Sequence, residues 1–247
     1  MRRARRSIPL ALQVPRRHLG AMAESPPAVS PLKAAIVPVT PLQQNCTLLW
    51  CTATMNGAFV DPGGDLDRLK AAAVSHGVSI EKILLTHGHI DHCGAAGILA
   101  RELKVEIEGP HQADRFWIAR LADDGRSYGI RGEPFEPDRW LENGDTVTVG
   151  ELSLDVYHCP GHTPGHVIFH HPRSQLAIVG DVLFHGSIGR TDFPLGNHQD
   201  LIDAITTRLW PLGDETAFVP GHGPMSDFGT ERRTNPFVAD AVLARSR

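Results

Sequence analysis

Short apolar runs and side chains at helical spacing alternate along the chain. Runs with strand-like composition occupy residues 34–39, 47–51, 58–60, 82–85, 147–149, 152–157, 167–169, 176–179 and 217–219. Side chains three or four positions apart indicate helices at residues 66–76, 95–103 and 201–209. Asn197 is expected to cap the last of these helices, with Asp200 near its positive end. Because both element types recur from end to end, the pattern predicts an α/β fold.

The composition is that of an ordinary globular protein. The 247 residues could form one large domain or two small ones, and we expect a single domain over residues 32–247. Apolar residues make up 41% of the chain and charged residues 21%, which is enough apolar material for a sizeable core. No apolar run approaches the roughly 20 residues that a membrane span needs, so we expect no membrane association.

Residues 1–31 form a basic, proline-containing extension that we expect to be disordered. Residues 1–23 hold six of the 24 basic residues and no acidic residue. The rest of the chain therefore holds 18 basic and 28 acidic side chains, a net charge of −10. An acidic body argues against nucleic acid as a partner. The basic start is compatible with an organelle transit peptide, a secretory signal or a start assigned too far upstream. We favour the last interpretation, with Met22 as the start of a cytoplasmic protein.

The four cysteines do not form a Cys-x-x-Cys pair and are too few for a disulfide scaffold in a chain of this length. We expect Cys46, Cys51, Cys93 and Cys159 to be reduced. Cys93 follows His92 directly and Cys159 lies three residues before His162, so either thiol could lie near a metal site. We favour the alternative, in which both cysteines are small buried side chains without a role at the metal site.

The segment Thr86-His87-Gly88-His89-Ile90-Asp91-His92 places three imidazoles and a carboxylate directly after an apolar run. Neutral imidazole and carboxylate groups suit borderline divalent ions such as zinc, and a carboxylate can bridge two ions. In an extended segment His87 and His89 project to the same side and can hold one ion, while Asp91 and His92 can turn toward a second. Packing gives no reason for this spacing, which therefore predicts a metal site.

Three further segments bounded by glycine carry the same residue types, namely residues 160–166, 180–181 and 220–224. Their candidate ligands are His162, Asp181 and His222, which together with residues 87–92 supply enough ligands for two metal ions. Glycine permits tight turns, so we expect the ligands on loops at strand ends. Two roles are possible for His166, support of a metal ligand or a purely structural role. The other histidines are expected to be bystanders: His18, His76, His111, His158, His170, His171, His185 and His198.

These motifs, in this order, resemble the metallo-β-lactamase superfamily over about residues 33–237, and within it the short bacterial branch of the glyoxalase II group, the hydroxyacylglutathione hydrolases. The resemblance implies a four-layer αββα sandwich with the metal site along one edge between the sheets. It also implies two divalent ions, Zn²⁺ in the first place, with Fe or Mn as alternatives. The implied ligands are His87, His89 and His162 for the first ion, Asp91, His92 and His222 for the second, and Asp181 bridging both. In relatives the turn at Asp61 supports the metal cleft.

The resemblance implies hydrolysis of a glutathione-based acyl-thiol. Two ions bridged by Asp181 would share a water and lower its pKa toward ~7, giving a bridging hydroxide as nucleophile, so Asp91 and Asp181 are the catalytic candidates. A thioester is an apt substrate because its thiolate, with a pKa near ~8.5, leaves with little help from an acid. The expected reaction converts S-lactoylglutathione to D-lactate and glutathione.

The loop Gly189-Arg190-Thr191-Asp192-Phe193 departs in part from that group. Arg190 matches a basic residue of the longer glyoxalase II enzymes, but Asp192 stands where they have an aromatic. Arg190 is the candidate substrate contact, through a forked pair of hydrogen bonds to a carboxylate, and a salt bridge with Asp192 is the alternative. The longer enzymes also bind glutathione with a C-terminal helical segment, whereas only a short tail follows Pro236 here.

The same loop resembles persulfide dioxygenases, relatives that use one iron and glutathione persulfide, and these are the main enzymatic alternative. Residues 220–224, Pro-Gly-His-Gly-Pro, have the hydrolase form, because the dioxygenases carry Ala before this His and Asp after it. A lactonase is disfavoured because Phe184 stands where lactonases place a tyrosine. A zinc β-lactamase is disfavoured because those enzymes lack the bridging Asp. A non-catalytic binding module is the alternative of another class, and the complete ligand set argues against it.

Overall fold

The computed structural model describes residues 31–245 of the chain. The expected disorder of residues 1–31 therefore concerns residues that lie, apart from Pro31, outside the described part, and so do Met22 and His18. Within the described residues no helix is long and apolar enough to cross a membrane.

The first half of the chain forms a five-stranded sheet in the order of the sequence. Its strands are β1 (Leu32–Val39), β2 (Gln44–Cys51), β3 (Asn56–Val60), β4 (Ser79–Leu84) and β5 (Glu106–Glu108). The first three strands pair antiparallel, while β3, β4 and β5 pair parallel. Parallel neighbours need a crossover. The crossovers are α1 (Leu66–His76) and then α2 (Ile90–Cys93) with α3 (Ala96–Leu103).

The second half forms a six-stranded sheet. In spatial order its strands are β13 (Ser226–Asp227), β12 (Ala217–Pro220), β9 (Leu176–Gly180), β8 (Val167–His171), β7 (Leu152–His158) and β6 (Thr146–Val149). Only β9 and β12 pair parallel. Their crossover contains the hairpin β10 (Leu183–Phe184) and β11 (Ser187–Ile188), then α6 (His198–Ala204), the π-helical η3 (Ile205–Leu209) and the 3-10 turn η4 (Trp210–Leu212).

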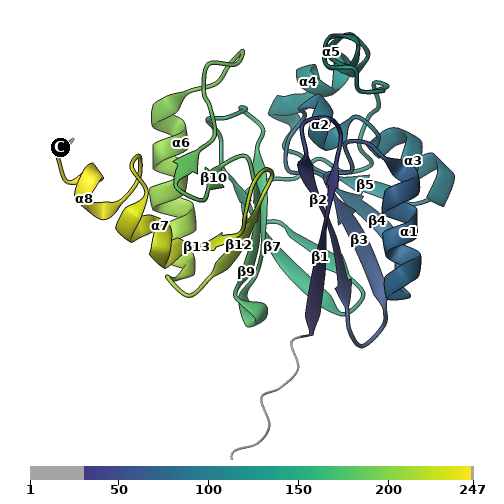
Figure 1. Ribbon diagram of the computed structural model, residues 1–247, viewed down its shortest axis with the longest axis horizontal. Helices are drawn as coiled ribbons and strands as arrows, with labels where there is room; N and C mark the ends of the chain where they lie inside the picture. Colours follow the sequence, from purple (N-terminus) through teal and green to yellow (C-terminus); the bar gives the residue numbers. More distant parts are fainter. Residues whose placement is uncertain (1–30, 246–247) are drawn as a thin grey trace, which may run out of the picture.

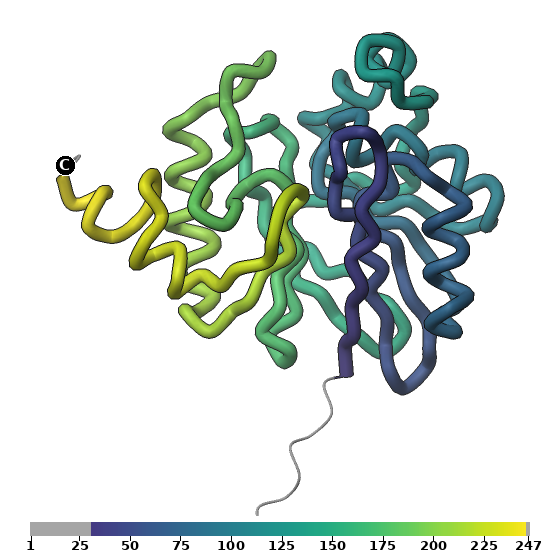
Figure 2. The backbone as a smooth tube through the Cα atoms, viewed as in Figure 1, coloured from purple at the N-terminus to yellow at the C-terminus, as the bar shows by residue number. Residues whose placement is uncertain are grey.

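The remaining helices are short and lie in the connections between strands or after the last strand. They are η1 (Gln112–Asp114), α4 (Arg115–Ala119), α5 (Leu121–Tyr128), η2 (Pro172–Ser174), α7 (Phe228–Thr234) and α8 (Asp240–Leu243). In Figure 1, α1 and α3 cover the outer face of the first sheet, and α6 and α7 cover the outer face of the second. Figure 2 shows the two halves of the chain side by side, purple to blue against green to yellow.

The alternation of side chains along each strand explains the four layers. In β2, Leu48 packs into the cluster under α1 and α3, while its neighbour Leu49 packs between the sheets. In β8, Phe169 packs between the sheets and Ile168 packs into the cluster under α6. Successive residues of a strand point to opposite faces, so strands such as β2 and β8, which are buried at every position, are covered on both sides. The αββα sandwich that the resemblance implied is confirmed.

The predicted elements are confirmed in kind, with shifted ends. Each of the nine strand-like runs overlaps a strand, and the three helical stripes correspond to α1, α3 and α6 with η3. The Asn197 side chain accepts hydrogen bonds from the backbone N–H groups of Gln199 and Asp200, so the predicted cap is confirmed. The sequence pattern missed β5, α4, α5, α7 and several two-residue strands. The strands and α4 are too short to show a period, and α5 and α7 carry few apolar side chains. All four cysteines are buried and free.

Candidate metal centre

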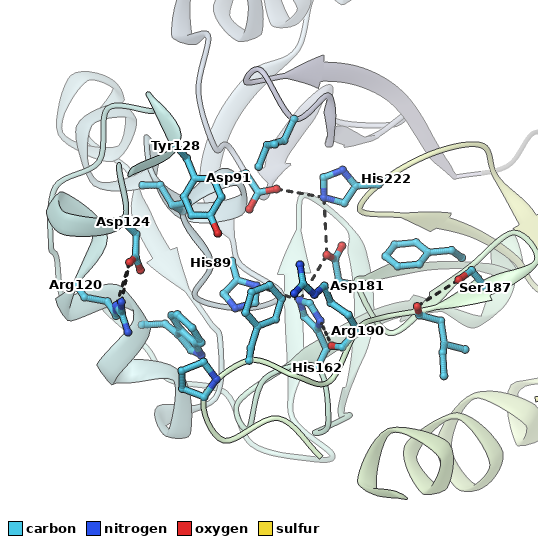
Figure 3. Close-up of a pocket in the computed structure, with 17 residues that line it drawn as sticks. His89, Asp91, Arg120, Asp124, Tyr128, His162, Asp181, Ser187, Arg190 and His222 are labelled. Atoms are coloured by element: carbon cyan, nitrogen blue, oxygen red, sulfur yellow. Dashed lines mark hydrogen bonds and ion pairs between the residues drawn. The ribbon is translucent and has the colours of Figure 1, made fainter. Parts of the chain in front are cut away.

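The predicted ligands meet at one edge of the sandwich, after the ends of four strands. Five of them lie on loops, as expected, whereas Asp91 and His92 lie in the short helix α2. Residues 87–92 follow β4 of the first sheet, whereas His162, Asp181 and His222 follow β7, β9 and β12 of the second. Figure 3 shows His89 and Asp91 facing His162, Asp181 and His222 across a common space. The site is therefore assembled from both halves of the chain.

Three histidines form the first group of candidate ligands. His89 Nδ1 lies 3.1 Å from His87 Nε2 and 3.0 Å from His162 Nε2, and all three rings are buried. Two nitrogens bound at ~2.1 Å to a tetrahedral ion lie about 3.4 Å apart, so this triangle is close to the size that zinc requires. Burial, and then the neighbouring histidines, hold the pKa of His87 and His89 well below the usual range. The imidazoles are therefore neutral, and their nitrogens can each offer a lone pair to a metal ion.

Asp91, His92 and His222 form the second group. His222 Nε2 lies 3.2 Å from Asp91 Oδ2, and His92 Nε2 lies 3.9 Å from the same oxygen. Burial alone would raise the pKa of Asp91, but the nearby His92 and His222 outweigh it and lower that pKa. His222 is the most exposed ligand candidate, at 31% of its side-chain area, and Asp91 and His92 lie deeper. This second position is therefore the one nearer to solvent.

The Asp181 carboxylate lies between the two groups. Its Oδ2 is 3.5 Å from His162 Nε2 in the first group and 3.8 Å from His222 Nε2 in the second, and its Oδ1 is 3.3 Å from His92 Nε2. Among the described residues, neither Asp181 Oδ1 nor His92 Nε2 has a well-aligned hydrogen bond, although both atoms are buried. Such orphaned polar atoms are costly unless something else satisfies them. Divalent cations fit this arrangement.

Hydrogen bonds behind the ligands select which ring nitrogen faces the centre. His92 Nδ1 donates to Asp61 Oδ2 at 2.9 Å, and the same carboxylate accepts from the Thr86 N–H at 2.7 Å and the Thr86 hydroxyl at 2.6 Å. The Thr86 hydroxyl in turn accepts from His87 Nδ1 at 3.0 Å. His162 Nδ1 donates to the Arg190 carbonyl at 2.8 Å. With the proton on Nδ1 in each of these three histidines, the Nε2 lone pair is directed at the centre.

We expect Asp61→Asn to weaken metal binding and activity by about 10–100-fold. An asparagine amide placed opposite His92 Nδ1 would donate rather than accept, so the His92 proton would move to Nε2 and block the nitrogen that faces the centre. Titration with a competing chelator would measure the change in metal affinity. Unchanged affinity would show that Asp61 does not set the His92 tautomer.

Asp114 was missed by the sequence interpretation, although it joins two ligand loops. Its buried carboxylate accepts hydrogen bonds from the Gly88 N–H at 2.9 Å, the Thr163 hydroxyl at 2.7 Å and the Gly165 N–H at 2.6 Å. Burial raises its pKa to about 6, so the carboxylate is still largely ionised at neutral pH and can accept all three bonds. Gly88 separates His87 from His89 and Thr163 follows His162, so this residue holds the first group of ligands together.

Asp114→Ala should lower the free energy of unfolding by about 3 kcal/mol or more, because each buried donor left without a partner costs roughly 1–3 kcal/mol. Urea denaturation of the metal-loaded protein would measure the loss. The exposed Asp123, on neighbouring α5, offers a matched control, and Asp123→Ala should cost much less. Equal losses for the two variants would contradict the assigned role.

Backbone contacts at two further positions keep the loops close together. The Asn45 amide donates to the carbonyls of Pro220 and Gly223 at 3.0 and 2.8 Å, which secures the loop that carries His222. A Cβ added at Gly63 would lie 1.5 Å from the Asp91 carbonyl oxygen, so the turn at residues 61–64 can pack against α2 only with glycine there. Asn45 carries no signal that would single it out in the sequence.

His166 supports the site and points away from the two ligand groups. Its Nε2 accepts a hydrogen bond from the Asp181 N–H at 3.0 Å, and its ring stacks on His87 at a centroid distance of 4.6 Å. Of the two roles left open, the structure therefore favours support of Asp181. Among the described residues, the histidines expected to be bystanders and the four cysteines belong to no candidate metal group.

A cleft of about 650 Å³ opens over Asp91, Asp181 and His222. One wall comes from α4 and α5, and the other from residues 184–194, with apolar side chains on both. Arg190 lines this cleft, but its guanidinium makes a forked salt bridge with Asp192, at 2.7 Å for both contacts, and lies 4.4 Å from the centre of the Phe193 ring. The salt bridge considered as the alternative from the sequence is therefore present. It does not remove Arg190 from the cleft.

The fold and the site together define a metallo-hydrolase with room for divalent cations. The sequence profile of the metallo-β-lactamase superfamily matches residues 39–222, and the chain belongs to this superfamily. It is 42% identical over 205 residues to the hydroxyacylglutathione hydrolase GloC of Haemophilus influenzae, an alignment that covers 82% of this chain and 96% of that protein. The family predicted from the motifs is confirmed.

Two solved structures are similar over nearly their whole length. The BLEG-1 B3 metallo-β-lactamase is 33% identical with a TM-score of 0.76, and the match covers 84% of this chain and 99% of that one. TTHA1623 in a di-iron-bound form is 36% identical with a TM-score of 0.74, and the match covers 83% and 100%. The fold thus occurs with a pair of metal ions in a similar protein.

Proposed function

We propose that the protein hydrolyses S-lactoylglutathione to D-lactate and glutathione with two divalent ions. The observation that carries this proposal is the position of Asp181, whose two carboxylate oxygens face both groups of three ligand candidates. The similarity to a hydroxyacylglutathione hydrolase supports the substrate class. The proposed ligands are His87, His89 and His162 for one ion, Asp91, His92 and His222 for the other, and Asp181 for both.

When bound, such ions lower the pKa of a shared water toward ~7 and polarise the thioester carbonyl. The side chains of the protein have complementary tasks. Asp181 and Asp91 supply the negative charge that a pair of cations requires, and both carboxyl groups are held in the ionised form by the nearby imidazoles in spite of their burial. Asp61 and Thr86 keep His92 and His87 in the tautomers that the site requires.

The leaving group needs little assistance. A thiolate has a pKa near ~8.5 and departs without a strong general acid. The cleft supplies apolar walls from Trp117, Phe184, Ile188 and Phe193, which suit the carbon chain around the thioester. Arg190, at the rim, is our proposed contact for a substrate carboxylate, which would share the guanidinium with Asp192.

Zinc is the metal that we propose for both positions. The candidate ligand atoms are imidazole nitrogens and carboxylate oxygens, with no thiolate among them. This set suits zinc, and it also accepts iron or manganese, so availability decides between them. Iron is a real competitor because TTHA1623 occurs in a di-iron-bound form.

Hydrolysis of S-D-lactoylglutathione by the purified protein tests the proposal, with thioester absorbance followed over time and the metal content measured on the same sample. We expect rapid turnover with two ions per chain. Absence of hydrolysis in a sample that holds two ions would reject the proposed function.

Persulfide dioxygenase activity is the second candidate, and the loop Gly189-Arg190-Thr191-Asp192-Phe193 favours it. Residues 220–224 have the hydrolase form, which is why it ranks second. One iron per chain, no thioester hydrolysis, and oxygen uptake with glutathione persulfide would reverse the order of the two candidates.

A further inference from the structure

The wall of the cleft formed by α4 and α5 carries an ion pair that has no role in the metal centre. Arg120 and Asp124 both line the cleft that also contains Asp181. Figure 3 shows this pair on the α4 and α5 wall, together with Tyr128 and apart from the metal ligands. Neither residue was singled out from the sequence, where an arginine and an aspartate four positions apart indicate only an ordinary surface pair.

The geometry of this pair leaves donor and acceptor atoms available. Arg120 Nε and Nη2 both contact the same oxygen, Asp124 Oδ1, at 3.1 and 3.0 Å. Within the described residues, Arg120 Nη1 and Asp124 Oδ2 have no hydrogen-bond or ion-pair partner. The guanidinium carbon of Arg120 lies over the Trp117 ring, 5.2 Å from its centre, a cation–π contact that favours this position of the side chain. The pair therefore offers a cation and an anion side by side at one cleft wall.

We propose that Arg120 and Asp124 bind the α-carboxylate and α-ammonium groups at the γ-glutamyl end of the substrate, an inference that rests on the proposed function. The α-carboxylate contacts Arg120 and the α-ammonium contacts Asp124 Oδ2. A glutathione thioester carries these two opposite charges on one carbon only at its γ-glutamyl end. Its glycine end carries a carboxylate alone, which Asp124 would repel.

The energetics allow such a subsite. An ion pair that is partly exposed contributes little stability by itself, so a ligand can enter it at small cost. The Asp124 side chain is only 15% exposed and the Arg120 side chain is 45% exposed, so ligand contacts here are partly shielded from water. A hydrogen bond to a charged group contributes about 10–100-fold to affinity, which is more than a neutral hydrogen bond contributes. This subsite therefore acts on KM and leaves the reacting centre unchanged.

The first test varies the substrate. Steady-state kinetics of the metal-loaded enzyme are measured with S-D-lactoylglutathione, with the same thioester acetylated on its amino group, and with S-D-lactoyl-N-acetylcysteinylglycine. The last substrate lacks the γ-glutamyl residue, and its acetyl group keeps the cysteine amine from attacking the thioester. We expect KM to rise about tenfold or more for the last two substrates, with kcat little changed. Equal KM values for all three would overturn the subsite and leave the proposed function intact. No hydrolysis of any of them would overturn the proposed function, and the subsite with it.

The second test varies the protein. Arg120→Gln should raise KM for S-D-lactoylglutathione about tenfold and leave the kinetics with S-D-lactoyl-N-acetylcysteinylglycine unchanged. Arg120→Lys should restore part of the affinity, because it keeps the charge without the planar fork. Asp124→Asn should remove the preference for the free amino group over the acetylated one. An equal loss with all substrates would indicate a structural role and overturn the proposal.

Arg126 provides the matched control. It lies on α5, as Asp124 does, and pairs with Asp123, but both side chains are largely exposed and neither lines the cleft. Arg126→Gln should leave every kinetic constant unchanged. Calorimetric titration with glutathione supplies a measurement that does not depend on turnover. We expect glutathione binding to weaken about tenfold in Arg120→Gln and to remain unchanged in Arg126→Gln.

Discussion

Replacement of Asp181 by asparagine is expected to abolish thioester hydrolysis and to lower the metal content from two ions per chain toward one. Asparagine has almost the same volume as aspartate, so the buried site keeps its shape. It has no negative charge, however, and offers one oxygen where two face the ligand groups. Loss of an outer hydrogen-bonding partner of a metal ligand costs ~10–100-fold, so we expect loss of a shared ligand to cost at least ~10³-fold in kcat/KM.

Metal analysis and kinetics on the same protein sample would measure both effects of Asp181→Asn. Asp67→Asn is the matched control, because Asp67 is fully exposed on α1 and, within the described part of the chain, pairs only with Lys70. The control should keep both ions and full activity. If Asp181→Asn retained two ions and hydrolysed the substrate at the normal rate, Asp181 would not connect the two groups and the proposed mechanism would be wrong.

Removal of the metal ions is expected to lower the thermal unfolding midpoint by about 8–16 °C for each ion removed. Ligands present at 1,000 times their Kd stabilise the folded state by ~4 kcal/mol, and ~1 kcal/mol moves the midpoint of a protein of this size by about 2–4 °C. The structural reason is that imidazoles and carboxylates are crowded together in a buried space. In the first group alone, three ring nitrogens lie within 4.8 Å of one another. Without cations, their lone pairs face one another.

Thermal unfolding before and after treatment with a chelator would measure this effect, and added zinc should restore the midpoint. Asp181→Asn should show a smaller shift than the natural sequence, since it has fewer ions to lose. An identical midpoint with and without metal would mean that the seven side chains do not hold ions in the folded protein.

The ligand set could be predicted from the sequence because its members lie in short motifs with restrictive spacing. His87 and His89 alternate along an extended segment, so their relation to one ion follows from local geometry. The resemblance pointed to Asp61 as a supporting residue, but Asp114 could not be found in this way. Asp114 acts on Gly88, 26 positions away, and on Gly165, 51 positions away, and an isolated aspartate gives no sign of such partners.

Substrate contacts were harder still to predict. Arg190 was proposed from its match to a family position, and the structure shows that its guanidinium is already paired with Asp192. Arg120 and Asp124 carried no motif at all, and α4 and α5, which place them at the cleft, were absent from the predicted elements. Motifs describe the reacting centre because its chemistry restricts residue type and spacing. Many different combinations of residues can form a substrate-binding wall, so such a wall has no characteristic sequence pattern.

The sequence by itself determined the α/β class, the main strands and helices, the superfamily and the residues that we propose as metal ligands. Each of these depends on a local period or a short motif, which neighbouring residues specify. Only the tertiary structure decided that Asp114 supports the ligand groups and that Arg120 and Asp124 share a cleft with them. It also supplied the distances that place Asp181 between the two groups and the hydrogen bonds of Asp61, which the resemblance had only implied. These relations join loops that follow strands of two different sheets. They exist only after the sheets have packed together, because burial of the apolar strand faces is what brings those loops to one edge.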